Sequence, residues 1–91
     1  MKTRKFTEEE ARWAGDQLGM NWDIFDLEQF RMGLEVELEH GSIDPVTNVT
    51  SDDLTVTAKI ALAHLKEIPD YYTRLAKMEA EAEQELKNLN K

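Results

Sequence analysis

Apolar residues recur at three-and-four spacing in four segments of the chain, and capping signals bound these segments. Thr7 followed by Glu10 forms a capping-box pattern before the first segment, and Gly19 follows its end. Asp26 precedes the second segment and Gly41 follows it, which repeats the same pair of signals. The sequence therefore predicts four helices, over about 8–18, 27–40, 53–67 and 69–88.

The connection over 41–53 is the longest one between these helices. Its letters, GSIDPVTNVTSDD, bring Gly, Pro, Asn, Ser and Asp into close succession and predict a loop of roughly ten residues. Its valines and threonines have no second strand to pair with, so we expect no sheet. Thr50 or Ser51 would cap the third helix, and Pro69 would end it and open the fourth.

Each of the last three helices carries an apolar stripe that predicts the face it buries. Adjacent residues on a helix point about 100° apart, so we expect Tyr71 to enter the core and Tyr72 to lie nearer its edge. Gly33 would permit a neighbouring helix to approach closely. The stripes are Leu27, Phe30, Leu34 and Leu38 in the second helix, Leu54, Ala58, Ala61, Leu65 and Ile68 in the third, and Tyr71, Leu75, Met78, Ala82, Leu86 and Leu89 in the fourth.

These elements predict an all-α fold, a small four-helix bundle with orthogonal or up-down packing. We expect residues 1–91 to form a single helical domain, because a chain of this length can bury one modest core. Residues 1–6 are expected to be a flexible basic end. The end of the last helix, over 80–91, is expected to project from the body, to fray, or to pair with another copy.

Composition narrows the classes of function. The chain has no cysteine, which excludes disulfides, zinc-thiolate sites and thiol nucleophiles. It has neither an apolar run long enough to cross a membrane nor a signal-peptide pattern, so we expect a soluble cytoplasmic protein. The net charge is -8, and the stretch 23–53 holds nine acids against one base, Arg31. Such a surface attracts cations or a basic protein and repels nucleic acid and anionic lipid.

Two phrases of the sequence carry a resemblance to a known family. They are DLEQFRMGLEVELEHG at 26–41 and KIALAHLKEIPDYYTRLAKME at 59–79, with TNVTSDD between them at 47–53. In these phrases the chain resembles small bacterial and phage-encoded proteins that are classed as a domain of unknown function. The resemblance implies a compact helical protein of bacteria or their phages. It implies no activity and no site residue.

Metal-ligating residue types occur on one flank of the second helix and one flank of the third. Glu37 and His40 are three residues apart, and so are His64 and Glu67. Residues at this spacing lie on adjoining turns of one face, an arrangement that helix bundles use to bind metal ions. Antiparallel packing of the two helices would bring Glu37 opposite His64.

Three interpretations of these residues stay open. In the first, Glu37 and His64 hydrogen-bond each other or a backbone group at the edge of the core. In the second, Glu37, His40, His64 and Glu67 bind a divalent zinc, iron or manganese ion. The Tyr72 hydroxyl would then reach His64 or the acidic flank beside the metal ligands. The third is an acidic docking face for a basic partner protein, formed by the outward-facing glutamates Glu28, Glu35 and Glu39.

Catalysis is not expected from this sequence. Ser42, two residues after His40, has no oxyanion-hole motif, and the chain has no phosphate-binding glycine loop. We expect a protein-interaction or assembly module that binds a basic partner or itself and needs no cofactor. In a phage, such a protein would serve in the virion or inhibit a host protein. The alternative is a divalent-metal-binding protein.

Overall fold

The computed structural model describes residues 5–43, 45–48 and 53–89, with the backbone alone for 40–43. Within these ranges the chain forms four helices and no strand. The all-α prediction is therefore confirmed. The helices are α1 (Glu8–Gln17), α2 (Leu27–Ile43), α3 (Leu54–Glu67) and α4 (Tyr71–Leu89).

Side chains that accept backbone N–H groups fix the helix starts. Thr7 Oγ1 accepts the Glu10 amide at 3.1 Å, and Glu10 Oε1 accepts the Thr7 amide at 2.9 Å, which is the predicted capping box. Asp26 and Asp53 each accept the amide of the residue three positions later, at 3.0 and 3.1 Å. Asp53 therefore caps α3. The two caps suggested there by the sequence, Thr50 and Ser51, lie outside the described residues.

The helix ends follow the sequence signals less closely. Gly19 has a φ of 71°, the left-handed conformation that terminates α1 as predicted. The prediction that Gly41 ends α2 is wrong, because α2 continues to Ile43. A glycine inside a helix only weakens it, by about 1 kcal/mol relative to alanine. Pro69 lies in the turn before α4 and not in its first turn, since α4 begins at Tyr71.

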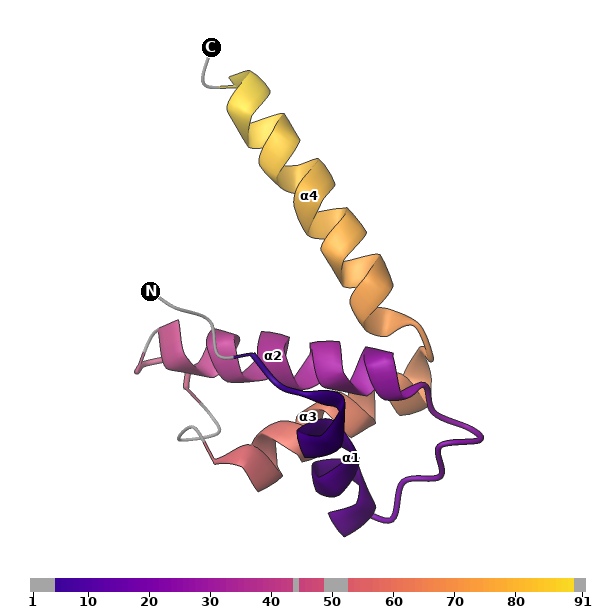
Figure 1. Cartoon of the computed structure of the whole chain (residues 1–91). Coiled ribbons are helices and arrows are strands. Elements are labelled where there is room, and N and C mark those ends of the chain that lie inside the picture. The colour runs from indigo at the N-terminus through magenta and orange to yellow at the C-terminus, as the bar shows by residue number, and fades with distance from the viewer. Residues whose placement is uncertain (1–4, 44, 49–52, 90–91) are drawn as a thin grey trace.

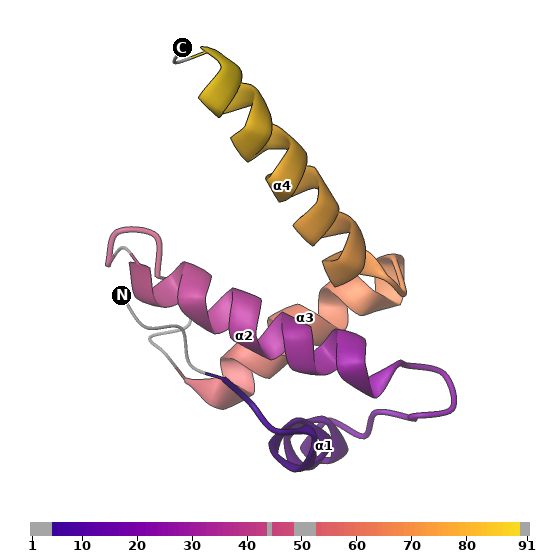
Figure 2. The same cartoon turned by 45° about the horizontal axis from the view of Figure 1, so that its top comes forward.

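Three helices form the body of the molecule (Figure 1). α2 and α3 pack side by side and run in opposite directions, and α1 crosses below them, where Figure 2 views it nearly end-on. Phe30 and Leu34 of α2 and Leu65 of α3 are buried in one core, which confirms the middle of both predicted stripes. The stripe ends are more open, because Ile68 is exposed where α3 finishes. Other buried core residues are Ala11, Ala14, Met20, Ala58 and Ala61.

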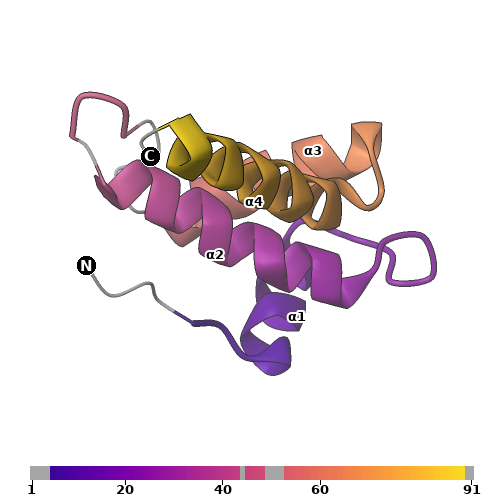
Figure 3. The ribbon, with the colours of Figure 1, turned by 90° about the horizontal axis from the view of Figure 1, so that it is seen from above.

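The fourth helix leaves the body after Leu75. Seen from above, α4 lies beside α2, in front of part of α3, and runs in the same general direction as α2 (Figure 3), while Figure 1 shows that it rises away from α2 along its length. Every residue from Ala76 to Leu89 is exposed. The radius of gyration is 14.2 Å, against about 12 Å for a compact chain of this length. The fourth helix thus adds to the bundle only through its N-terminal part.

Candidate functional site

A buried tyrosine attaches α4 to the body. Tyr72 is 1% exposed and Tyr71 is half-buried, so the prediction that Tyr71 enters the core and Tyr72 lies at its edge is wrong. The reason is the missing side chain at Gly33, where a Cβ atom would lie 2.5 Å from Cε2 of the Tyr72 ring. The same Cβ would lie 3.1 Å from Ala61 Cβ. The close approach predicted at Gly33 therefore occurs, and an aromatic ring makes it.

The Tyr72 hydroxyl joins a small polar cluster between α2, α3 and α4. It donates to Glu37 Oε2 at 2.8 Å, and the same oxygen lies 3.5 Å from His64 Nε2. The His64 ring stacks on Tyr71, with centroids 4.3 Å apart and planes only 3° from parallel. Burial raises the pKa of Tyr72, and the charge of Glu37 raises it further, so the hydroxyl keeps its proton and remains a donor.

The fold brings together two of the four predicted metal ligands. Glu37 and His64 meet, as antiparallel packing of α2 and α3 requires. Within the described residues no group of three or more His, Asp or Glu side chains could hold a metal ion, so Glu67 does not complete such a group with them. The His40 side chain lies outside the described residues. Metal binding stays a prediction, which a chelator-sensitive mass in native mass spectrometry would test.

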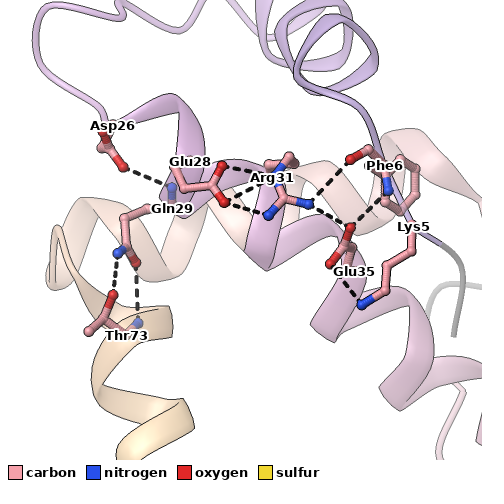
Figure 4. A network of polar contacts seen from close by, with 8 residues as sticks. All are labelled: Lys5, Phe6, Asp26, Glu28, Gln29, Arg31, Glu35 and Thr73. Atoms are coloured by element: carbon pink, nitrogen blue, oxygen red, sulfur yellow. Dashed lines mark hydrogen bonds and ion pairs between the residues drawn. The ribbon is translucent and has the colours of Figure 1, made fainter.

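A second polar contact fastens α4 to α2. Gln29 is buried, and its side-chain Nε2 donates to Thr73 Oγ1 while its Oε1 accepts the Thr73 amide at 3.3 Å (Figure 4). Both ends of the Gln29 amide are thereby paired with one residue of the first turn of α4. Together with Tyr72, this pairing holds the first turn of α4 on the body, and the helix is exposed from Ala76 onward.

Glu35 does not face a partner. Its side chain is only 12% exposed, and its Oε2 accepts both the Phe6 amide and Arg31 Nη1 at 2.8 Å (Figure 4). The prediction that Glu35 points outward on a docking face is wrong, because Arg31 lies one turn away on the same flank and binds it. Glu28 is half exposed and pairs with the other edge of the same guanidinium, which lowers the pKa of the Glu28 carboxyl. Glu39 is exposed.

The Glu35 contact also anchors the N-terminal segment. Phe6 is 3% exposed and belongs to the core, so a flexible end over 1–6 is wrong for this residue. Arg31 Nη1 donates to the Phe6 carbonyl at 3.3 Å, and Lys5 Nζ lies 3.9 Å from Glu35 Oε1. Residues 1–4 lie outside the described residues.

We expect Glu35→Ala to lower the free energy of unfolding by about 1–3 kcal/mol, because it removes two short hydrogen bonds at a partly buried site. The matched control is Glu28→Ala, which removes an exposed partner of the same Arg31 and should cost under about 1 kcal/mol. Urea unfolding of both variants measures the difference. Equal losses would show that the contact between Glu35 and the Phe6 amide contributes nothing.

The exposed part of α4 carries an apolar stripe, which we name the α4 stripe: Met78, Ala82, Leu86 and Leu89. Its three large side chains are 55%, 59% and 79% exposed, from the first to the last. The apolar stripe that the sequence predicted for the fourth helix is longer and begins with Tyr71 and Leu75. These two residues do pack against the core. Beyond Leu75, no described part of the body covers the apolar face of α4.

The sequence analysis did not single out Trp13. It is 61% exposed on α1 and borders a shallow hollow, which Glu9, Glu10 and Leu54 also line. A signal was present, because at 100° per residue Trp13 lies about 160° from Ala11 and so on the opposite side of the helix from the buried alanines. A large aromatic residue there cannot contribute to the core.

The fold and these contacts define a class: a small all-α protein with a three-helix body and a projecting fourth helix. In the part of the chain that the structure describes, no helix is long and apolar enough to cross a membrane. The chain belongs to the family described as "Protein of unknown function (DUF5661)", whose model matches residues 11–81. The expectation that the chain belongs to a family of unknown function is thereby confirmed. No match was found among curated proteins or among solved structures.

Proposed function

We propose that this protein is an interaction module that uses its projecting helix, α4, to dock a partner protein. The observation that carries the proposal is the α4 stripe, whose large side chains are more than half exposed along one face of a single helix. A helix with one apolar face normally buries it, and an exposed apolar stripe marks a surface that a partner covers. Each large side chain contributes about 1.5–3 kcal/mol when it is fully buried.

The attachment of α4 supports the same role. Tyr72 and the pairing of Gln29 with Thr73 fix the first turn of the helix on the body. A fixed first turn reduces the conformational freedom that a partner must remove on binding, and so favours association. The polar cluster at Glu37 therefore serves to present a helix in this proposal.

The glutamates of α2 are a weaker docking surface. Glu35 binds the Phe6 amide and Arg31, so it could reach a partner only if these contacts inside the protein broke. Glu28 is paired with Arg31 as well. In a phage, docking through α4 would serve virion assembly or the inhibition of a host protein, and the identity of the partner separates these two roles.

Site-specific photo-crosslinking in the cell that naturally produces the protein tests the proposal. A photoreactive amino acid at position 86 should give a discrete adduct with another protein. The matched control is the same amino acid at position 84, because Gln84 is exposed but lies about 160° away from Leu86 around the helix. No adduct from position 86, or equal adducts from both positions, would overturn docking through the α4 stripe.

A further inference from the structure

We infer that the partner surface that covers the α4 stripe is a basic amphipathic helix, with Lys or Arg on both sides of its own apolar face. This inference rests on the proposed function and adds to it the chemistry of the partner. Two features of α4 carry it together: the exposed stripe and the positions of the acidic residues beside the stripe.

Four glutamates alternate along the exposed part of α4, and no base lies between Lys77 and Lys87. All four are exposed. Arg74, one turn before Lys77, is paired with Asp70 at 2.7 Å and not with any of these glutamates. The four residues are Glu79, Glu81, Glu83 and Glu85.

These glutamates border the α4 stripe on both sides. At 100° per residue, Glu79 and Glu83 lie about 65° and 105° to one side of the centre of the stripe. Glu85 and Glu81 lie about 55° and 95° to the other side. Flanking positions of this kind face the flanks of a docked helix, where their charge selects the partner and its orientation. A partner with bases on both flanks would therefore meet a carboxylate on each side.

The same charges disfavour the two other occupants of an exposed apolar helix face. A second copy of α4, parallel or antiparallel over the same segment, would bring glutamates against glutamates along both flanks, and like charges there are destabilising. An anionic membrane surface binds amphipathic helices through Lys and Arg, and α4 presents carboxylates instead. A basic amphipathic helix would cover the stripe with its apolar face and pair its bases with the glutamates on both flanks.

The length of the stripe sets the length of the occupant. From Met78 to Leu89 the stripe extends about 17 Å at 1.5 Å per residue. A helix of about twelve residues, or three turns, covers this distance. The apolar contacts supply most of the affinity, and the exposed charge pairs, at about 0.2–1 kcal/mol each, supply the selectivity.

Three synthetic helical peptides test the inference against the full chain. They share one leucine stripe, and Lys, Gln or Glu flanks it. We expect the Lys peptide to bind about tenfold more tightly than the Gln peptide in fluorescence anisotropy, since four exposed pairs of modest strength give about 1.4 kcal/mol. The Glu peptide should bind most weakly, and added salt should reduce the differences.

Two charge variants of the protein separate local recognition from net charge. Replacing all four flanking glutamates with glutamine should remove the preference for the Lys peptide. The matched control removes the same charge from exposed positions outside α4 and should keep most of the preference. The control substitutions are Glu9→Gln, Asp23→Asn, Glu39→Gln and Glu67→Gln. An equal loss in both variants would overturn the inference, because net charge alone would explain the preference.

The remaining outcomes distinguish the inference from the proposed function. Equal binding of all three peptides, lost in Leu86→Gln, would leave docking through α4 standing and overturn the basic partner. Self-association of the chain in sedimentation, lost in Leu86→Gln and without peptide binding, would make a second copy the occupant. If the chain neither binds any of the peptides nor self-associates, both proposals are overturned.

Discussion

Tyr72→Ala is expected to lower the free energy of unfolding by about 3–5 kcal/mol and to release α4 from the body. Tyr72 is the one buried residue within the described length of α4, and its ring fills the space over Gly33. Its removal leaves a cavity and also deletes the hydrogen bond to Glu37. Urea unfolding measures the loss of stability, and amide hydrogen exchange of residues 71–79 measures the release of the helix.

The matched control is Tyr72→Phe, which keeps the ring and removes only the hydroxyl. We expect it to lower the free energy of unfolding by about 1–3 kcal/mol, because Glu37 loses the hydrogen bond that it accepts at 2.8 Å. Protection of residues 71–79 should persist in this variant. If Tyr72→Ala cost no more than Tyr72→Phe, packing of the ring over Gly33 would not be what attaches α4.

The difference in stability between the natural protein and Tyr72→Phe should also depend on pH. Burial raises the pKa of Tyr72 above its ordinary value of 10.0, and Glu37 raises it further. A pKa that is raised in the folded state contributes stability that is complete below pH 10 and is lost as the pH rises above it, by up to about 1.4 kcal/mol per unit. The difference in stability between the natural protein and Tyr72→Phe should therefore narrow from pH 9 to pH 11. A constant difference would contradict the raised pKa.

Gly33→Ala is expected to lower the free energy of unfolding by about 1–3 kcal/mol, although alanine favours helix more than glycine does. The new Cβ would lie 2.5 Å from Cε2 and 2.9 Å from Cζ of Tyr72. The Tyr72 ring is buried and held by Glu37, so it cannot move away without opening the attachment of α4. Thermal or urea unfolding measures the effect.

Gly15→Ala is the matched control for this collision. Its Cβ would lie 2.3 Å from the Trp22 ring, which is only half-buried and is held by an exposed hydrogen bond to Asp16, so we expect this ring to give way more easily than the buried Tyr72 ring. Both variants replace a helical glycine with alanine, so a larger loss at Gly33 points to the fixed ring. In the Tyr72→Ala background Gly33→Ala should be neutral or stabilising. A loss of the same size in that background would show that Tyr72 is not the obstacle.

The sequence predicted the helices because their signals are local. The capping box of Thr7 and Glu10 and the left-handed Gly19 involve residues a few positions apart, and each has the predicted role. The apolar stripes also predicted the middle of the core, since Phe30 and Leu34 are buried as expected. Gly41 failed as a stop signal because glycine allows a helix end without imposing one.

Side-chain partners from distant segments could not be read from local spacing. Glu35 lies on one flank of α2 by helical angle, where spacing alone does not predict a partner, yet it binds the Phe6 amide, which is 29 residues away in the chain. The order of the two tyrosines was reversed because the packing of α4 against Gly33 decides which ring has space. Glu37 and His64 were predicted to face each other, and the Tyr72 hydroxyl was placed within reach of His64 or the acidic flank, but that it binds Glu37 itself follows only from the packing of α4.

The sequence by itself determined that this chain makes four helices, where the first two begin, and which residues form the stripe on α4, because backbone capping and helical periodicity act within a few residues. Only the tertiary structure decided that α4 leaves the body near Leu75. That departure exposes the α4 stripe and its bordering glutamates together. The stretch 23–53 holds the whole net charge, yet the acids that border this exposed apolar stripe lie on α4, because only the packing of the helices decides which apolar face stays uncovered.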